Sequence, residues 1–304
     1  KKLDDVPLPA RHLIRNEYYK NIFTKQMNFT AMLSTRGCPY RCAFCDQKTP
    51  KYRIRSAESF IEEVKANYEK YGIREFDIYD STFTANKKRV IKVCNLLKES
   101  GLNLGWTIRS RVDSVNEQML NELKEAGCHT IMYGIESVDR DILKRMNKDI
   151  SPERVWEIIS YTKKIGIETL GFFLFGFPGE THKTIKATIK FSLDLPLDYA
   201  QYTVLLPFPD TEVYEYYMDK GLNDYWAEYT LDPDNEKIIE LIDTEMTRKE
   251  ASKYLGEAYR KFYFRPRIIW RRAMKMKSID EFKRLSLGAI NLLRNSFFNA
   301  EKIN

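Results

Sequence analysis

The stretch "FTAMLSTRGCPYRCAFC", residues 29–45, joins a short apolar segment to a loop that holds three of the five cysteines of the chain. Residues 29–34 form a mostly apolar run of the length that is typical of a buried strand. Gly37 and Pro39 flank the first cysteine, and such residues mark a loop. We therefore predict that the fold begins with a buried strand that runs directly into a cysteine loop.

Five more strand patterns follow, at residues 75–80, 104–110, 130–136, 170–177 and 200–206. Helical patterns alternate with them at residues 57–72, 87–101 and 115–127, from residue 152, and at 182–195. Ser56 and Ser151 are suitable N-caps, and Pro152 suits a first helical position. This alternation predicts an α/β fold with a parallel sheet and helices outside it. Six repeats are too few for an eight-stranded barrel, so we predict a partial (β/α)6 TIM-like barrel, with a doubly wound sheet as the alternative.

Chemically useful side chains follow the predicted strands at one end. They are Cys38 after the first strand, Asp80, Ser81 and Thr82 after the second, Arg109 and Arg111 on the third, Glu136 at the end of the fourth, and residues 176–180 after the fifth. In either fold a ligand site lies at the carboxyl ends of the strands. We therefore expect these residues to share one rim of the sheet.

The three clustered cysteines, Cys38, Cys42 and Cys45, have the spacing Cys-x3-Cys-x2-Cys. Thiolates at this spacing suit a soft metal, either iron or zinc. A structural zinc site takes four protein ligands, and no fourth follows at the usual spacing, although His12 and His129 are available in the chain. A 4Fe–4S cluster held by three cysteines leaves one iron open for a non-protein ligand. We predict this cluster, with zinc and metal-free thiols as the alternatives.

The segment "GCPYRCAFC" after the first strand resembles the radical S-adenosylmethionine (SAM) superfamily, and the resemblance extends over residues 25–210. The resemblance implies that the open iron chelates the amino and carboxylate groups of SAM. An electron from the reduced cluster then cleaves the sulfonium and yields a 5′-deoxyadenosyl radical, which abstracts hydrogen from the substrate. In such enzymes the cofactors carry the chemistry and the protein positions them.

The resemblance also implies contacts to the methionine part of SAM. The segment "YDSTFT" stands where relatives carry a glycine-rich motif that meets the amino group, which suggests Asp80, Ser81 and Thr82. Glu136 in "GIES" matches a position that contacts the ribose or the methionine, and its alternative is a loop cap. Lys148 stands where relatives carry a cation for the carboxylate, and its alternative is a solvated lysine at a helix end.

Near the adenine, the resemblance implies Leu174 and Phe175, which precede the motif "GFPGET", and Phe44 beside the last cysteine. Arg109 and Arg111 lie on the same face of the third strand and point into the barrel mouth. A buried arginine needs a partner, so they either bind an anionic part of the cofactor or form salt bridges with Glu136 or Asp80.

Four further residues have structural explanations. Cys94 lies on an apolar helix face, where we expect it to act as a small hydrophobic residue. Cys128 and His129 adjoin the amino end of the fourth strand, away from the rim, and we expect a structural role. His182 begins a helix near the rim, where contact with the substrate is an open alternative.

The flanking segments suggest a subfamily. "LDDVPLPARHL" resembles the linker that follows an N-terminal cobalamin domain, and "FYFRPRIIWRR" resembles the same subfamily, which includes the anaerobic magnesium-protoporphyrin ester cyclase and lipid-modifying enzymes. No Asp-x-His-x-x-Gly cobalamin motif occurs in the chain. The resemblance implies cobalamin-dependent methylation or a related C–H functionalisation, with cobalamin bound by a domain outside this chain. A radical enzyme without cobalamin, or one that modifies tRNA, is the alternative.

We divide the chain into a linker from an upstream domain (residues 1–24), the radical SAM barrel (25–210) and a largely helical, basic extension (211–304). From about residue 207 to the Asp-rich stretch the chain is predicted to be irregular, and residues 247–297 are predicted to be helical. Enzymes that modify tRNA usually add a β-barrel there, so a nucleic-acid partner is not expected. The resemblance implies a small-molecule or lipid-like substrate and an electron donor such as flavodoxin or ferredoxin.

The odd number of cysteines argues against a disulfide framework and favours a reducing, cytoplasmic setting. No apolar run approaches the roughly 20 residues needed to span a bilayer. Residues 259–284 carry ten basic and two acidic residues. Apolar residues are interspersed among them: Phe262, Phe264, Ile268, Ile269, Trp270 and Met274. This segment is either a helix packed on the barrel or a peripheral membrane contact, and Pro266 should break or start a helix in it.

Overall fold

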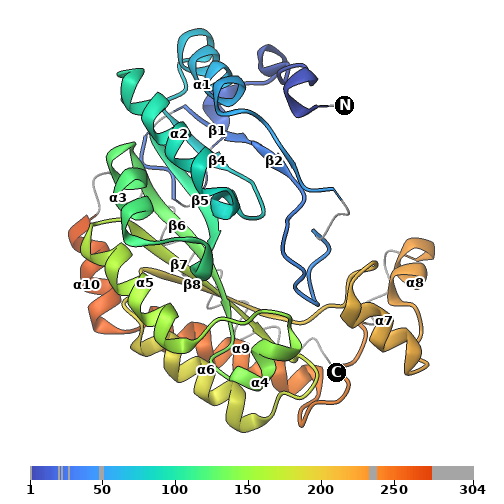
Figure 1. Ribbon diagram of the computed structural model, residues 1–304. Coiled ribbons are helices and arrows are strands. Elements are labelled where there is room, and N and C mark those ends of the chain that lie inside the picture. The colour runs from blue at the N-terminus through green and yellow to red at the C-terminus, as the bar shows by residue number, and fades with distance from the viewer. Residues whose placement is uncertain are drawn as a thin grey trace.

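The computed structural model describes residues 2–19, 21, 23–26, 28–47, 51–232 and 238–275. Six parallel strands form one sheet in the order β1-β4-β5-β6-β7-β8 (Figure 1). They are β1 (Phe29–Met32), β4 (Glu75–Ile78), β5 (Gly105–Arg111), β6 (Cys128–Glu136), β7 (Glu168–Phe175) and β8 (Tyr199–Val204). Each strand pairs with the next strand of the series, so the sheet is a single curved wall.

Helices cover the outer face of this wall (Figure 1). They are α1 (Ala57–Tyr71), α2 (Lys87–Glu99), α3 (Glu117–Glu125), α4 (Arg140–Arg145), α5 (Pro152–Lys164) and α6 (His182–Asp194). The predicted caps are present, since the Ser56 side chain accepts from the backbone N–H of Ser59 and the Ser151 side chain accepts from that of Arg154. The partial barrel is therefore confirmed, and the doubly wound alternative is wrong.

The amino end of the sheet is closed by the chain itself. Glu75, the first residue of β4, is buried and accepts the backbone N–H groups of Lys25 and Gln26, each at 2.7 Å. The ring of Phe23 packs edge-on against Tyr199, the first residue of β8, with 5.0 Å between ring centres. His129 also lies 3.3 Å from Glu75, in agreement with the structural role expected for it. The open end of the barrel is therefore the carboxyl end.

Both outer strands of the sheet have their free edges covered. At β1, the guanidinium of Arg11 donates to the Ala31 carbonyl at 2.8 Å. At β8, the Tyr263 hydroxyl bonds both the N–H and the carbonyl of Ala200, at 3.1 and 2.8 Å. These side chains satisfy backbone groups that would otherwise be open to pairing with another chain.

The region after residue 207 differs from the prediction. It was expected to be irregular, but it contains α7 (Glu212–Asp219) and α8 (Tyr225–Leu231). The Thr211 side chain caps α7 by accepting the N–H of Tyr214, and the helix buries Val213 and Tyr217 one turn apart. The prediction was wrong because it relied on the turn-forming residues before α7 and not on the short apolar face of the helix, which consists of Val213 and Tyr217.

Further along, α9 (Arg248–Tyr263) packs on β8 and α6, and α10 (Pro266–Lys275) follows it. Residues 276–304, which include the end of the basic segment, lie outside the described residues. A two-stranded hairpin, β2 (Thr35–Arg36) with β3 (Arg53–Ile54), was not predicted. Short 3-10 turns are η1 (Leu3–Asp5), η2 (Arg11–Leu13), η3 (Asn16–Tyr18), η4 (Phe83–Ala85) and η5 (Val112–Ser114).

Candidate active site at the carboxyl end of the barrel

The cysteine loop leaves β1 and the hairpin strand β2 and crosses the open end of the barrel. Gly37, just before Cys38, has a φ of +78°, a conformation that favours glycine and lets the chain turn into the loop. The backbone N–H of Ala43 donates to the Met146 carbonyl at 2.9 Å, and the Ala43 carbonyl accepts from Val213 at 3.1 Å. The loop is thus held between the end of α4 and the start of α7.

The three cysteines of the loop are free thiols. Burial raises the pKa of Cys42, and it raises the pKa of Cys45 to about 11. The positive charges of Lys148 and Arg111 lower the pKa of Cys42 against that effect. The Cys38 sulfur lies 3.5 Å from the Thr82 hydroxyl. Thiolates in this loop therefore depend on nearby cations and on ligation for their stability.

Arg111, at the end of β5, provides one of these cations. Its Nη1 lies 3.2 Å from the Cys42 sulfur, and its Nε and Nη2 donate to the two Asp113 oxygens at 2.9 and 2.8 Å. Its guanidinium also lies 4.2 Å from the centre of the Tyr40 ring. Asp113 therefore fixes the orientation of the guanidinium, and Nη1 is directed at the sulfur of Cys42.

Arg109, two residues earlier, has an equivalent set of partners. Its Nη1 and Nη2 lie 2.8 and 3.2 Å from the Asp77 carboxylate, and it stacks 3.8 Å from the Tyr79 ring centre. The predicted salt bridges of these arginines to Glu136 or Asp80 are wrong. Of the two arginines, Arg111 is the one that reaches the cysteine loop, and contact of Arg109 with the cofactor remains a prediction.

Glu136 and Lys148 form a buried ion pair with 2.8 Å between Oε1 and Nζ. Lys148 is only 3% exposed, so the alternative of a solvated lysine is wrong. Glu136 has a φ of +68°, and the β6–β7 register shifts beside it. A Cβ on Gly134 would lie 2.6 Å from Lys148 Nζ and 2.7 Å from Glu136 Oε1, so a side chain at this position would displace the ends of the pair. Strained backbone of this kind is concentrated at functional sites.

Asp80 is fully buried, and its carboxylate holds the start of the cysteine loop. It accepts the backbone N–H groups of Ser34 at 2.7 Å and Thr35 at 2.9 Å, and also the Ser34 hydroxyl. Burial raises the pKa of Asp80 against these bonds. Thr82 donates its hydroxyl to the Ser81 carbonyl at 2.8 Å and faces Cys38. Contact of this segment with SAM remains a prediction.

At the end of β7, the residues expected near the adenine lie in the wall of the barrel. Phe175 is fully buried, and its ring stacks on Tyr202 with 5.6 Å between ring centres. Leu174 is 8% exposed, and Phe44 is half-buried and packs against the core. Because the Phe175 ring is engaged, any contact with a nucleotide would be through its backbone, and all three contacts remain predictions.

The loop after β7 is held by a buried acid and by a later part of the chain. Glu180 is fully buried, and burial raises its pKa to about 7. One of its oxygens accepts the N–H of Gly176, and the other, Oε1, has no partner among the described residues. The N–H of Gly179 donates to the Asp243 carbonyl at 2.6 Å. His182 bonds Tyr254 on α9 at 3.0 Å, so its ring is engaged by the helical layer.

The donor set fits an iron–sulfur cluster better than a single metal ion. Within the described ranges, no group of three or more His, Cys, Asp and Glu side chains could hold a metal ion. The loop offers three free thiols, with a guanidinium on Cys42 and the Glu136–Lys148 pair nearby. In a cluster each thiolate binds a different iron, so the three sulfurs need not converge on one point, and the cations offset its negative charge.

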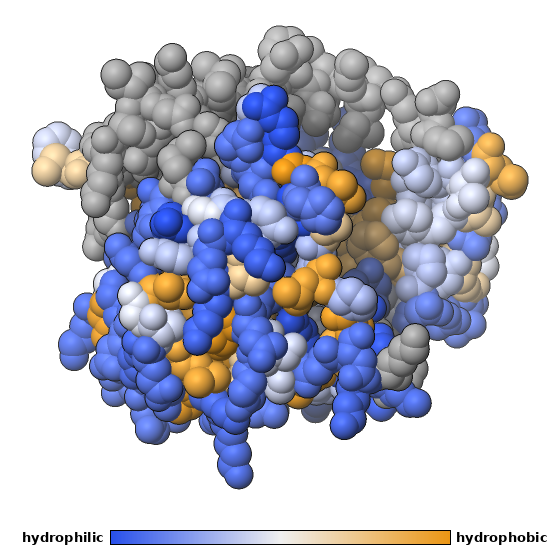
Figure 2. Space-filling model, turned by 90° about the horizontal axis from the view of Figure 1, so that it is seen from above, coloured by the Kyte–Doolittle hydropathy of each residue, from blue (hydrophilic) through white to orange (hydrophobic). Residues whose placement is uncertain are grey.

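None of the described helices has both the length and the apolar character needed to cross a membrane. Among the residues coloured in Figure 2, viewed from the α1 side, most of the surface is hydrophilic and the apolar residues form separate groups.

Comparison with known proteins agrees with the resemblance of the cysteine segment. An uncharacterized methyltransferase of Pyrococcus horikoshii is 38% identical over 273 residues, which are 88% of this chain and 58% of the relative. The anaerobic magnesium-protoporphyrin IX monomethyl ester cyclase of Rubrivivax gelatinosus is 29% identical over 61% of this chain and 34% of the relative. The chain thus spans about half the length, or less, of the relatives it matches.

Among solved structures, the cobalamin-dependent S-adenosylmethionine radical enzyme OxsB has the same fold, with a TM-score of 0.59 and 17% identity. The match covers 88% of this chain and 46% of the other. A family model described as the radical SAM superfamily matches residues 32–192, more than half of the 304-residue chain. The family implies a 4Fe–4S cluster and SAM as cofactors, and the chain belongs to the radical SAM superfamily.

Proposed function

We propose that Cys38, Cys42 and Cys45 hold a 4Fe–4S cluster at the open end of the barrel, where it binds SAM. When bound, the cluster supplies the electron that cleaves SAM reductively for C–H functionalisation of a substrate. The observation that carries the proposal is the cysteine loop itself, which meets Arg111 at 3.2 Å at the carboxyl ends of the strands. This is the end of a parallel (β/α) sheet where active sites form.

In this proposal the residues of the chain hold the cysteine loop in place and offset the negative charge of the cluster. Asp80 fixes the start of the loop through two backbone N–H groups, and Met146 fixes its middle. The cations Arg111 and Lys148 offset negative charge at Cys42, and Glu136 holds Lys148 in place. Residues 23–26 cover the opposite end of the barrel, where the backbone N–H groups of Lys25 and Gln26 donate to Glu75.

We further infer that the whole protein carries out cobalamin-dependent methylation, or a related modification, of a hydrophobic small molecule. Support comes from relatives named as methyltransferases and as a magnesium-protoporphyrin cyclase. The shared fold with a cobalamin-dependent enzyme agrees with it. In this proposal, cobalamin is bound by a domain outside the chain, and flavodoxin or ferredoxin delivers the electron. The alternative is a radical SAM reaction without cobalamin.

We also propose peripheral contact with an anionic membrane through α10. Of the apolar residues of the basic segment, Phe262 and Ile268 are buried, so part of it packs as a helix on the barrel. The other four are 49–70% exposed: Phe264, Ile269, Trp270 and Met274. Exposed apolar residues beside basic ones are typical of segments that bind a membrane surface.

The test is anaerobic reconstitution followed by iron and sulfide analysis and an assay for 5′-deoxyadenosine and methyl transfer. Replacing any one of Cys38, Cys42 and Cys45 by Ala should abolish the brown chromophore or make it labile. The matched controls Cys94→Ala and Cys128→Ala should retain it, because both residues are buried in the core. Zinc in place of iron in the anaerobic protein would overturn the proposal.

A further inference from the structure

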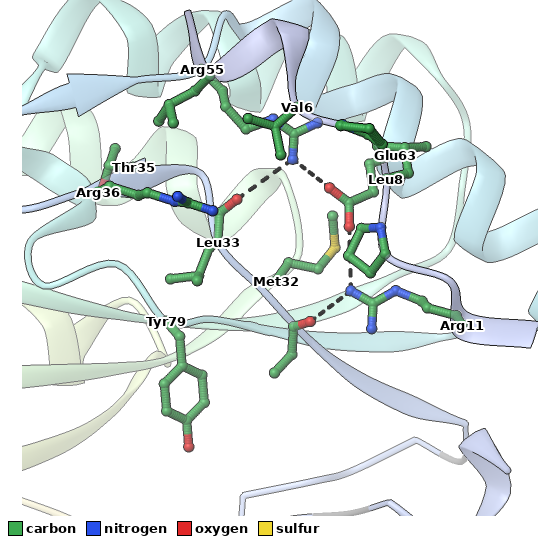
Figure 3. A pocket seen from close by; sticks show the side chains of 14 residues that line it. Val6, Leu8, Arg11, Met32, Leu33, Thr35, Arg36, Arg55, Glu63 and Tyr79 are labelled. Carbon is green, nitrogen blue, oxygen red and sulfur yellow. Dashed lines mark hydrogen bonds and ion pairs between the residues drawn. The ribbon is translucent and has the colours of Figure 1, made fainter. Parts of the chain in front are cut away.

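A cavity of about 400 Å³ lies beside the free edge of β1 (Figure 3). Residues from the amino-terminal segment, β1, β2 and α1 line it, together with Arg55 and Tyr79. Its size is within the range of small-molecule sites, which is roughly 300–1,000 Å³. None of the residues proposed above to contact the cluster or SAM lines it, but Thr35 and Tyr79 of its wall contact two of them, Asp80 and Arg109, so the cavity adjoins that site without sharing its residues.

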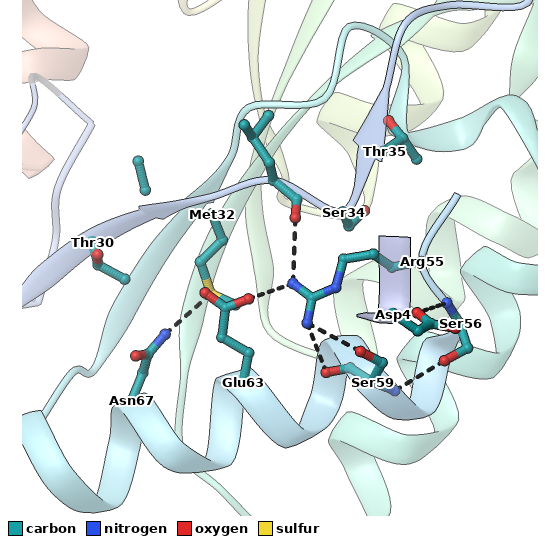
Figure 4. Close-up of polar contacts among 12 residues, drawn as sticks. Asp4, Thr30, Met32, Ser34, Thr35, Arg55, Ser56, Ser59, Glu63 and Asn67 are labelled. Atoms are coloured by element: carbon teal, nitrogen blue, oxygen red, sulfur yellow. Dashed lines mark hydrogen bonds and ion pairs between the residues drawn. The ribbon is translucent and has the colours of Figure 1, made fainter. Parts of the chain in front are cut away.

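The charged side chains of the cavity lining are three arginines and one glutamate, so two positive charges are in excess. Glu63 is the acidic residue of the lining, and its two oxygens bond Arg11, at 3.3 Å, and Arg55. Figure 4 shows that Arg55 is also tied to the backbone of Ser59. The side chain of Arg36 also lines the cavity, and it has no hydrogen bond or ion pair with another described residue. The wall therefore carries a net positive charge.

Two buried polar atoms of the lining residues also have no partner among the described residues. They are the hydroxyl of Thr35, which is 3% exposed, and Nε of Arg11, which is 8% exposed. Buried polar groups are almost always hydrogen-bonded, so unpaired ones indicate a ligand or bound water. The exposed guanidinium of Arg36 is a donor that an anionic oxygen in the cavity can reach.

Most of the remaining lining is apolar, and four of its side chains are exposed. Val6, Leu8, Leu33 and Tyr79 are each 40–52% exposed, although they share one concavity. Apolar side chains gathered in a recess with a few polar groups are typical of a binding pocket. An apolar ligand body would cover them and remove this surface from water.

We propose that this cavity binds a small amphiphilic anion, with its carboxylate or phosphate on Arg36 and its apolar part over Leu8, Leu33 and Tyr79. The inference goes beyond the radical reaction, because it needs neither the cluster nor SAM. It can therefore be tested on metal-free protein, and its failure would leave the proposed function untouched.

The experiment is isothermal titration of the metal-free chain with octanoate, octyl phosphate and octanol, each below its micelle-forming concentration. The two anions should bind at least tenfold more tightly than octanol, and the stronger of them identifies the head group. Butyrate and butyl phosphate, with shorter apolar parts, should bind more weakly than the corresponding octyl compounds.

The variant Arg36→Gln should lose at least tenfold in affinity for both anions. Arg53→Gln is the matched control, because Arg53 stands opposite Arg36 in the hairpin and is exposed but does not line the cavity. Equal binding of octanol, an equal loss in both variants, or no binding of any probe would overturn the proposal.

Discussion

Replacing Arg111 by Gln should make Cys42 a weaker acid in the metal-free protein. Arg111 Nη1 lies 3.2 Å from the sulfur, and the arginine side chain is only 8% exposed, so solvent screens the interaction little. A hydrogen bond to a charged group contributes about 1.5–3 kcal/mol. Since every 1.4 kcal/mol is tenfold, the thiolate population at a given pH should fall about 10- to 100-fold. Burial already raises the pKa of Cys42, and the loss of Arg111 acts in the same direction.

The assay is the rate of iodoacetamide alkylation of Cys42 between pH 6 and 10, followed by peptide mass spectrometry under argon. Only the thiolate reacts, so Arg111→Gln should slow alkylation at every pH below the thiol pKa. Arg109→Gln is the matched control, because Arg109 has the same kind of Asp and Tyr partners but no cysteine contact. An unchanged profile for Arg111→Gln, or an equal shift in the control, would refute the reasoning.

Three further predictions concern other parts of the chain. Burial raises the pKa of Glu180 from 4.5 to about 7, so the stability that its protonated form contributes is full below pH 4.5 and is lost as the pH rises through 7. The loss in the free energy of unfolding is about 3 kcal/mol. Urea unfolding at pH 5 and 8.5 should show this difference in the parent protein and not in the Glu180→Gln variant. Glu136→Gln should destabilise the fold by about 3 kcal/mol, because it leaves Lys148 buried and unpaired, and adding Lys148→Met should restore stability. In a folded Glu136→Gln variant, weaker SAM binding would support contact of Glu136 with the ligand, and unchanged affinity would leave the residue structural. The chain should sediment with anionic but not neutral vesicles at low salt, and Trp270→Ser, at a 70% exposed site, should reduce this; equal sedimentation with both lipids would argue for packing alone.

For the two arginines on β5, the sequence predicted their shared face but not their ion-pair partners. Their shared face followed from the alternation of side chains along a strand, and the structure agrees. Their partners did not follow, because Asp77 lies on the neighbouring strand β4 while Asp113 lies in the turn η5 after the same strand. The pattern Arg111-x-Asp113 was a local signal that could have identified the second pair.

The sequence by itself determined the strand–helix alternation, the caps at Ser56 and Ser151, and the cysteine loop, because each depends on residues a few positions apart. Only the tertiary structure decided which side chains meet across the barrel. The closure of its amino end joins Lys25 to Glu75, 50 residues apart, and the contact of Arg111 with Cys42 spans 69 residues. Such pairs depend on the order and register of the strands, and no local pattern of residues specifies them.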